Sequence, residues 1–552
     1  MRLLPGCLPL LVLAACVSAA KDSGSAESIP GDASSDTSPD RETGDPSDTA
    51  AETDSGLDTS LDSGADTGLD TGTESGCLSD VDCDDGDPCS VDACDTATGA
   101  CSSAPFDGDA LGLWDMAALT DPSSLDLDVV AHTSTVEGLT VVDVYEVRYT
   151  SWESSGCVQL PIRVEAYVAV PVGATNVPGI VVAHGLGGYA DSDSASTPAA
   201  ELGAITLAYS GPGCGASEGT TSTPDHLFDT TDDPRDSWFW EHSVAAIRGL
   251  TVLEGWAGVD PTRLAMTGYS GGAVATWMVA GVDERLVAAV PVSGTGHLDL
   301  AIAATPNPGW EYDLLQAMSP PRTAADPEWV AYQRWLDPKN YLATLHADVL
   351  LIDGAQDEFF PLPSAVMTLT EAQAVRPDSR LLMIPNWDHG WYAYFTGDAA
   401  QALGVEGLAA WMGHTLGTAS DLADTPGMPQ IDGVGAWTCY DPANPWFTWS
   451  CAVVAASVPG ASAYAVESAT FWFSVDDALT FASWNLQDIG GGVWAAEVGT
   501  LDGAVYSSSN TVWFVDFELS TGAFGHTFHL TSLPSLPPGF SPYILPVDGP
   551  FP

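Results

Sequence analysis

Basic residues are scarce in this chain of 552 residues. Only 14 Lys and Arg stand against 75 Asp and Glu, so the formal net charge at pH 7 is −61. A field of that sign repels the phosphates of nucleic acids and the surface of anionic bilayers. We therefore expect no nucleic-acid partner, and the charge suits a soluble protein that acts outside the cytoplasm.

Long apolar runs are also missing. No segment after the N-terminus offers the ~20 uninterrupted apolar residues of a membrane-spanning helix, so we expect the body of the chain to lie outside the bilayer. The N-terminus itself, MRLLPGCLPLLVLAAC, has Arg2 followed by an apolar stretch that is too short to span. That combination is typical of an export signal.

The export signal ends in Leu13-Ala14-Ala15-Cys16, which resembles the lipobox of bacterial lipoproteins. The resemblance implies that residues 1–15 are removed and that Cys16 carries the lipid. The alternative is ordinary cleavage near Ala19, which would discard Cys16. We expect a lipid-anchored protein of the bacterial cell envelope, at the outer membrane or the cell surface, with extracellular release as an alternative. The lipid would be its sole contact with the membrane.

Residues 16–76 offer almost nothing to bury. They are rich in Ser, Thr, Asp and Gly, and from position 54 an aspartate recurs every four residues (Asp54, Asp58, Asp62, Asp66, Asp70). Such a segment repels itself and cannot form a core, which predicts a disordered acidic linker. A calcium-binding repeat is the alternative, but those repeats have more regular glycines.

Cysteines are concentrated in residues 77–105, which contain Cys77, Cys83, Cys89, Cys94 and Cys101. This spacing predicts a small disulfide-stapled module, and it resembles the short cysteine-rich repeats of bacterial surface lipoproteins. Because five is odd, one cysteine either pairs elsewhere, with Cys157 as a candidate, or stays free. The neighbouring aspartates leave calcium as an alternative, although the glycine falls one position late for an EF-hand loop.

Residues 125–420 have the pattern of an α/β domain. Residues 139–149 and 161–171 alternate apolar and polar side chains, which predicts antiparallel strands. Five short, continuously apolar segments predict strands buried on both faces, at 179–184, 203–209, 263–269, 286–293 and 349–353. Helical patterns over 239–256, 272–281, 364–374 and 398–412 lie between or after them, so we expect a mostly parallel sheet flanked by helices.

Residues 425–552 are again strand-like and rich in Trp and Gly. The segments 468–477, 493–500 and 510–519 predict a smaller C-terminal all-β domain, with Cys439 and Cys451 as candidates for a disulfide across it.

A G-x-S-x-G motif, Gly268-Tyr269-Ser270-Gly271-Gly272, stands between a buried strand and a helix of small residues. That context is required of a nucleophile elbow, in which a strained turn exposes the serine hydroxyl. About 85 residues upstream, His184-Gly185-Leu186-Gly187-Gly188 also follows a buried strand. We expect the backbone N–H groups of Leu186 and Gly271 to form the oxyanion hole.

The general base should follow both the serine and the acid in the chain. His389 meets this order in a loop after an apolar strand, whereas His414 stands at a helix end and His346 precedes the strand with the acid. Three carboxylates in LLIDGAQDEFFPL are candidates for the acid: Asp353 at the strand end, Asp357 in the loop and Glu358, which we expect to be solvated.

The segments GPGCGASEG, SWFWEHSVAAIRGLTVL and DGAQDEFF…IPNWDHGW resemble α/β-hydrolases. The similarity is to PhoPQ-activated pathogenicity-related proteins and to acetyl-xylan-esterase-like and dienelactone-hydrolase-like esterases, over roughly 160–415. In such families the acid follows the strand by G-x-x, so the resemblance implies Asp357. The loop position of Asp357 agrees, because it can reach His389 and orient its imidazole.

Together these residues predict a serine hydrolase that cleaves carboxylic esters through Ser270, His389 and Asp357, with an acyl-enzyme and no metal or organic cofactor. A small-molecule ester is the expected substrate. Its pocket would be walled by aromatic residues of 297–345 and by Trp391 and Tyr392. Two alternatives remain: a peptidase with the same triad, and a non-catalytic surface binding lipoprotein. The oligomeric state is left open.

Overall fold

The computed structural model describes residues 77–83, 90–105, 108–304, 307–389, 398–418, 426–441, 444–460, 464–498, 511–520 and 527–544. The predicted signal, Cys16 and the acidic linker lie outside these ranges, as do Trp391 and Tyr392. Among the described residues, no helix combines the length and hydropathy needed to cross a bilayer.

The chain divides into two compact units. The smaller contains most of the cysteine-rich segment, with the 3-10 helix η1 (Asp80–Cys83) and most of the hairpin formed by β1 (Ser90–Asp95) and β2 (Ala100–Pro105). Disulfides join Cys77 to Cys94 and Cys83 to Cys101, a pairing that the spacing of the cysteines had left open. Cys157, in the larger unit, is also disulfide-bonded.

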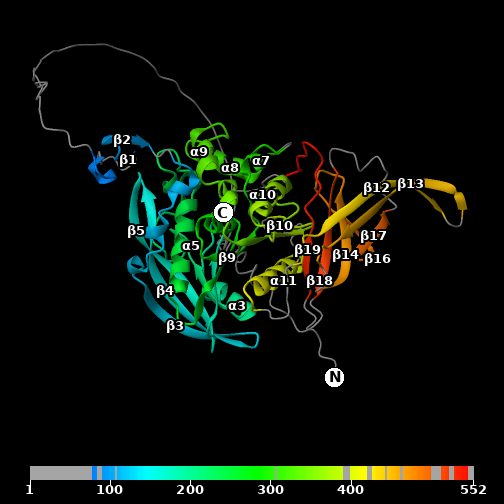
Figure 1. The fold of residues 1–552 in the computed structure, drawn as a ribbon, viewed down its shortest axis with the longest axis horizontal. Coiled ribbons are helices and arrows are strands. Elements are labelled where there is room, and N and C mark those ends of the chain that lie inside the picture. Colours follow the sequence, from blue (N-terminus) through cyan, green and yellow to red (C-terminus); the bar gives the residue numbers. More distant parts are fainter. Residues whose placement is uncertain are drawn as a thin grey trace, which may run out of the picture. The chain divides into compact units, whose positions relative to one another are not determined.

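A nine-stranded sheet forms the centre of the larger unit, in the order β11-β10-β9-β8-β6-β7-β5-β4-β3 (Figure 1). Its strands are β3 (Asp128–Glu137), β4 (Thr140–Ser155), β5 (Val158–Pro171), β6 (Val177–Ala183), β7 (Ile205–Tyr209), β8 (Val259–Tyr269), β9 (Leu286–Val292), β10 (Asp348–Gly354) and β11 (Arg380–Ile384). From β7 to β11 neighbouring strands are parallel, while β3, β4 and β5 are antiparallel and β5 joins β7 antiparallel.

Both faces of the parallel strands are buried. In β10, Val349 and Leu351 belong to one core together with α5 (Trp238–Glu254), α6 (Gly271–Val282) and α10 (Leu362–Val375). Leu350 and Ile352 point to the other face and pack with α11 (Asp398–Thr415). Helix α3 (Ser192–Leu202) covers the neighbouring part of that face. The continuous apolar segments therefore form strands that are buried on both faces, because alternate side chains pack against helices on opposite sides of the sheet.

Shorter elements connect these strands and helices. Before β3 lie η2 (Ala110–Leu113), α2 (Met116–Leu119) and η3 (Pro122–Ser124), which pack on the main core. Between β7 and β8 lie α4 (Pro224–Leu227) and η4 (Pro234–Asp236). The segment between β9 and β10 folds as α7 (Leu298–Ile302), α8 (Trp310–Ala317), α9 (Pro327–Trp335) and η5 (Pro338–Thr344).

Two further four-stranded sheets follow α11. One has the order β12-β13-β17-β16, with β12 (Gln430–Asp441), β13 (Asn444–Ser457), β17 (Val493–Val498) and β16 (Gln487–Gly490). The other has the order β15-β14-β18-β19, with β15 (Ala482–Asn485), β14 (Ala465–Ser474), β18 (Val512–Ser520) and β19 (Thr527–Thr531). The side chains of Cys439 and Cys451 fall outside the description, so their pairing stays a prediction.

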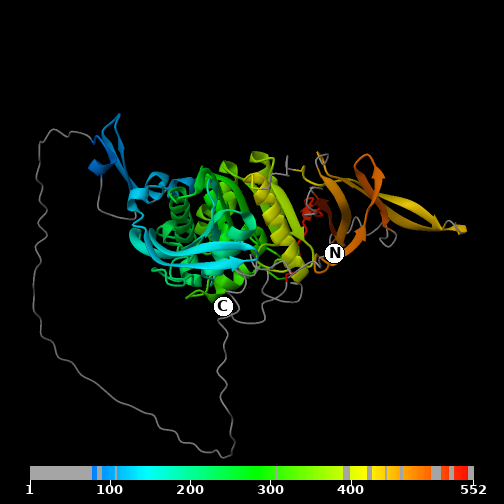
Figure 2. The same ribbon diagram turned by 90° about the horizontal axis from the view of Figure 1, so that it is seen from below.

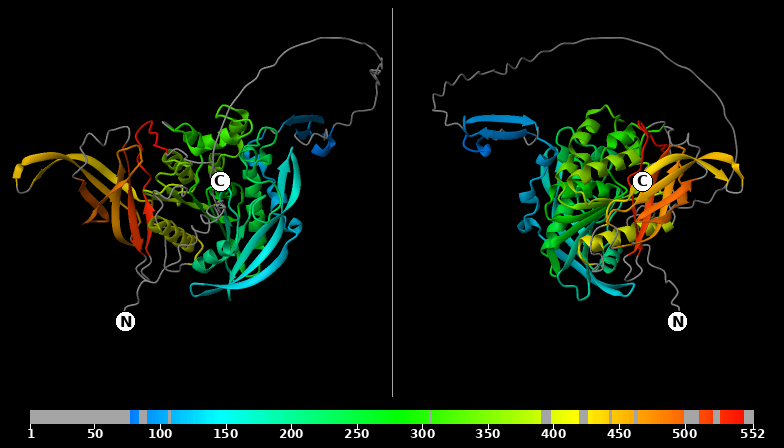
Figure 3. Two further views of the ribbon diagram at one scale, coloured as in Figure 1. Left: turned by 180° about the vertical axis from the view of Figure 1, so that it is seen from behind. Right: turned by 45° about the vertical axis from the view of Figure 1, so that its right-hand side comes forward.

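The C-terminal strands adjoin the β11 edge of the large sheet, opposite the edge formed by β3 (Figures 2 and 3). The Thr531 hydroxyl accepts a hydrogen bond from the Met383 N–H at 2.9 Å and donates to the Leu381 carbonyl at 3.3 Å. Phe517 and Leu530 share a core with Trp411 of α11. This packing covers an edge strand that would otherwise present unpaired backbone groups.

Candidate active site

Ser270 lies at the turn between β8 and α6 with φ 57° and ψ −118°, a backbone conformation that is strained for a side chain with a Cβ atom. The two glycines of the motif permit this turn. A Cβ atom at Gly268 would lie 2.3 Å from the Gly272 carbonyl oxygen, and one at Gly272 would lie 2.4 Å from the Ala183 carbonyl oxygen. The sequence therefore folds as the nucleophile elbow that the motif predicted.

The structure brings Ser270, His389 and Asp357 into one hydrogen-bonded chain. His389 Nε2 lies 2.9 Å from Ser270 Oγ, and His389 Nδ1 lies 2.8 Å from Asp357 Oδ2. The other oxygen of Asp357 accepts the N–H groups of Phe359 and Phe360 at 2.9 and 2.8 Å. These bonds fix the carboxylate, which in turn holds the imidazole with its proton on Nδ1 and its lone pair toward the serine.

Glu358 was predicted to be solvated, and that prediction is wrong. The side chain is 1% exposed, and its Oε2 accepts the His389 N–H at 2.8 Å. Burial, reinforced by the charge of Asp357, raises the pKa of Glu358 well above its usual value. Glu358 thus supports the backbone of the histidine loop rather than facing water.

Asp353, the other alternative for the acid, ends β10 and is fully buried. One of its oxygens accepts the Gly354 N–H at 2.9 Å. Burial, followed by the charge of Asp357, raises the pKa of Asp353 well above its usual value. A neutral Asp353 can donate a hydrogen bond to Asp357. His389 is hydrogen-bonded to Asp357 rather than to Asp353.

The two predicted oxyanion donors lie side by side. A Cβ atom built on Gly271 would come within 3.4 Å of the Leu186 nitrogen, and Gly185 packs against the Ser270 side chain. Helix α6 begins at Gly271, so the N–H of this residue is at the positive end of the helix dipole. Both N–H groups are therefore placed beside the serine, where charge would develop on a substrate carbonyl.

His184, in the same loop as Leu186, is a structural residue. Its Nε2 accepts the Gly211 N–H at 2.7 Å, and its Nδ1 lies 2.6 Å from the Gly185 carbonyl. Both contacts require a neutral ring with the proton on Nδ1. Burial lowers the pKa of His184 to about 4.

This histidine should make the fold sensitive to acid. In the unfolded state the His184 imidazole binds a proton below pH ~6.5, whereas in the folded state it binds one only below about pH 4. The free energy of unfolding therefore falls as the pH falls from 6.5 to 4. The loss integrates to roughly 3 kcal/mol. We expect His184→Gln to have a lower free energy of unfolding than wild type at pH 7. Between pH 6.5 and 4 its free energy of unfolding should fall by roughly 3 kcal/mol less than that of wild type. Urea unfolding at a series of pH values measures both. Parallel pH profiles for the two proteins would contradict this role.

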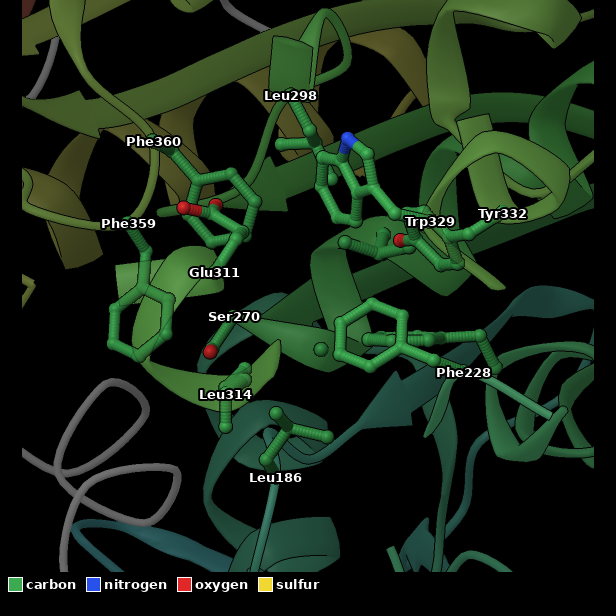
Figure 4. Close-up of a pocket in the computed structure, with 13 residues that line it drawn as sticks. Leu186, Phe228, Ser270, Leu298, Glu311, Leu314, Trp329, Tyr332, Phe359 and Phe360 are labelled. Atoms are coloured by element: carbon green, nitrogen blue, oxygen red, sulfur yellow. The ribbon is translucent and has the colours of Figure 1, made fainter. Parts of the chain in front are cut away.

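A small pocket of about 30 Å³ opens beside Ser270 (Figure 4). Its walls are almost entirely apolar. They come from the loops after β6 and β10, from the end of α4, from α5 and α6, and from the helices between β9 and β10: Leu186, Phe228, Phe239, Gly271, Val274, Leu298, Leu314, Trp329, Tyr332, Phe359 and Phe360. Of the aromatics predicted for this role, Trp329 and Tyr332 line the pocket. Trp310 packs against Phe359, and Tyr341 packs against Trp114.

Glu311 also lines the pocket, and sequence reasoning missed it. The side chain is buried, and neither carboxyl oxygen has a hydrogen-bond partner among the described residues. Burial, followed by the charge of Asp357, raises the pKa of Glu311 well above its usual value. The pocket therefore contains one neutral acid among aromatic walls. The sequence around Phe228 and Phe239, in an ordinary loop and helix, did not indicate that they line the pocket either.

The sheet is mostly parallel, and one of its strand-to-helix turns presents a serine. An acid and a histidine follow in the chain, and the acid contacts the histidine, which contacts the serine. These features define an α/β-hydrolase. The protein is a serine hydrolase of that fold.

Comparison with known proteins agrees with this class. Residues 247–419 match the Prolyl oligopeptidase family. No match was found among curated protein sequences.

Similar solved structures include the acetyl xylan esterase from Paenibacillus sp. R4 at 20% identity, covering 51% of this chain and 88% of that chain with a TM-score of 0.41. Acetyl xylan esterase 1 from Thermoanaerobacterium sp. JW/SL YS485 is 19% identical, over 53% and 92% of the two chains, with a TM-score of 0.41. The Pyrococcus horikoshii acylaminoacyl peptidase is 13% identical, over 52% and 51%, with a TM-score of 0.38.

Proposed function

We propose that this protein is a carboxylesterase that releases small acyl groups through Ser270. The observation that carries the proposal is the chain from Asp357 through His389 to Ser270, with donor–acceptor distances of 2.8 and 2.9 Å. The adjoining pocket of about 30 Å³ suits an acyl group of a few heavy atoms, such as acetyl.

Two steps follow from this geometry. In the first, His389 takes the Ser270 proton on Nε2 while Oγ attacks the carbonyl carbon, and the Leu186 and Gly271 N–H groups hold the oxyanion. His389 then gives that proton to the leaving alkoxide, which departs as the alcohol. In the second step, His389 removes a proton from water while the water oxygen attacks the acyl carbonyl carbon. The bond to Ser270 Oγ then breaks, Oγ takes the proton back from His389, and the acyl group leaves as the carboxylic acid.

A fluorophosphonate probe tests whether Ser270 is a nucleophile at all. We expect stoichiometric labelling of Ser270 in the folded protein, located by mass spectrometry of the modified peptide. An unlabelled Ser270 would refute the hydrolase mechanism and favour the non-catalytic binding protein.

A substrate panel then separates ester from peptide cleavage. The match to the Prolyl oligopeptidase family makes a peptidase the second candidate. We expect turnover of p-nitrophenyl acetate to exceed that of the butyrate and octanoate esters, because the pocket is small, and to exceed that of aminoacyl p-nitroanilides. Preferred cleavage of the anilides would establish the peptidase instead.

We propose that Glu311 contacts the acyl group of the substrate. A buried carboxyl with no partner costs about 1–3 kcal/mol of stability, so Glu311→Leu should stabilise the fold by that amount, measured by urea unfolding. The same change should remove a hydrogen-bonding group from the pocket, lowering kcat/KM roughly tenfold for a glycolate ester relative to the acetate ester.

Glu311→Gln is the matched control, because an amide keeps the shape and the hydrogen-bonding capacity of the neutral acid. It should retain the preference for glycolate that Glu311→Leu loses. Equal acetate-to-glycolate ratios in wild type and Glu311→Leu would show that this residue does not touch the acyl group.

We also propose that Cys16 anchors the protein to the bacterial cell envelope. The Leu-Ala-Ala-Cys sequence supports lipidation, and the disulfides Cys77–Cys94 and Cys83–Cys101 suit an oxidising compartment. Cys16→Ser should move the protein from the membrane fraction to the soluble fraction without changing its specific activity. An unchanged membrane fraction would favour another mode of attachment.

A further inference from the structure

Outside the triad, one imidazole and two carboxylates converge from three different elements. Glu153 lies near the end of β4, His226 in α4 and Glu241 in the first turn of α5. One side-chain donor atom of each residue lies within 4.8 Å of the donor atoms of the other two. These residues are far apart in the sequence and follow no spaced motif, so the sequence predicted no metal there.

Existing hydrogen bonds orient two of the three side chains toward a common point. His226 Nδ1 lies 3.0 Å from the Thr221 carbonyl, which places the ring proton on Nδ1 and leaves Nε2 facing Glu241 Oε2 at 3.2 Å. Glu241 Oε1 accepts the Ser154 N–H at 3.0 Å. An imidazole held through its far nitrogen by a backbone carbonyl is the usual arrangement of a histidine that binds a metal.

The inner carboxylate lacks an adequate partner. Glu241 is 0% exposed, and its Oε2 faces His226 Nε2 at 3.2 Å without the geometry of a hydrogen bond among the described residues. A buried oxygen without a proton donor, aimed at an imidazole nitrogen, is what a bound cation would satisfy.

We propose that Glu153, His226 and Glu241 bind one divalent transition-metal ion, of which zinc is the best fit. An imidazole ligand and only three protein donors do not suit calcium, which takes six to eight oxygens, or magnesium, which keeps several waters. Donor atoms at ~2.0–2.2 Å from a tetrahedral zinc ion lie roughly 3.3 Å apart, close to the 3.2 Å between Nε2 and Oε2. Glu153 is partly exposed, so it can close on the ion, and water completes the shell.

The ion would act on the pocket rather than on the reaction. His226 is two residues before Phe228, and Glu241 is two residues after Phe239, and both aromatic residues line the pocket beside Ser270. A cation that ties α4 and α5 to β4 therefore fixes that wall of the pocket. We expect its removal to raise KM for the ester substrate and to leave kcat within about threefold, because no ligand touches the triad.

Metal binding is tested on the full-length protein, stripped with a chelator and then titrated with zinc in competition with a chromophoric indicator. Glu241→Gln keeps the acceptor for Ser154 and should bind one equivalent of zinc fewer than wild type, as should His226→Gln. His132→Gln is the matched control, because His132 also faces an aspartate, Asp143 at 3.5 Å, but belongs to no cluster of three donors. It should bind as much zinc as wild type.

Two further measurements keep the proposal falsifiable if a buried substitution disturbs folding. Glu153→Gln alters the most accessible ligand, and zinc affinity should fall at least tenfold while the circular dichroism spectrum stays that of wild type. Cobalt in place of zinc should give the visible absorption of a tetrahedral site in wild type and a weaker band in Glu153→Gln. Equal zinc stoichiometry and affinity in wild type and all three ligand variants would overturn the proposal.

Discussion

Ser270→Ala is expected to lower kcat for a small ester by roughly a million-fold, since removal of the nucleophile disables the whole triad. The chain should fold as before, because alanine fits the turn that Gly268 and Gly272 permit. Residual turnover above the uncatalysed rate should persist, because the oxyanion donors remain. Initial rates with p-nitrophenyl acetate at high enzyme concentration measure this loss.

Ser293→Ala is the matched control for that experiment. Ser293 follows β9, the strand next to β8, has a positive φ of 49° and is fully buried, and its Oγ has no hydrogen-bond partner among the described residues. Its loss should leave kcat within a few-fold of wild type. Comparable damage from Ser270→Ala and Ser293→Ala would mean that the elbow serine is not the nucleophile.

Asp357→Asn is expected to lower kcat roughly ten-thousand-fold at neutral pH, because the amide would favour the wrong tautomer of His389. The Asn carbonyl can still accept the Phe359 and Phe360 N–H groups, so the loop should keep its shape. Its amide N–H would then face Nδ1 of His389, where a carboxylate oxygen lies now. Stopped assays across pH 6 to 9 with unfolding controls would measure the effect.

Asp353→Asn distinguishes the two aspartates of the same loop. Because Asp353 is held neutral by burial beside Asp357, an amide of the same shape should lower kcat by less than about tenfold. If Asp353→Asn proves the more damaging substitution in a folded protein, the assignment of the acid is wrong.

Local patterns predicted most of the fold. The five buried strands and the four helices named from the sequence lie within a few residues of β6 to β10 and of α5, α6, α10 and α11. Apolar runs and helical periodicity reflect burial on one or two faces, and that burial is what forms the sheet. The turn at Ser270 was predictable because its glycines satisfy a local steric requirement.

The roles of Glu358 and Glu311 could not be predicted from the sequence, because they depend on contacts with residues far away in the chain. Glu358 looked like a loop acid, yet its neighbours include the His389 N–H, 31 positions along the chain. Glu311 stands on a helix with an ordinary pattern, and only the packing of α8 against the Ser270 loop makes it a pocket residue. Burial of single polar side chains is decided by such packing, which periodicity cannot show.

The C-terminal strands bear on when the enzyme becomes active during its synthesis. Asn386, three residues before His389, donates to the Phe481 carbonyl at 3.0 Å and accepts the Phe481 N–H at 2.9 Å. Thr531 likewise completes the edge strand from which the histidine loop emerges. A chain that has been synthesised only as far as α11 contains all three members of the triad but lacks Phe481 and Thr531, which hold the backbone that leads to His389. Hydrolase activity should therefore begin only after the last strands have emerged and docked.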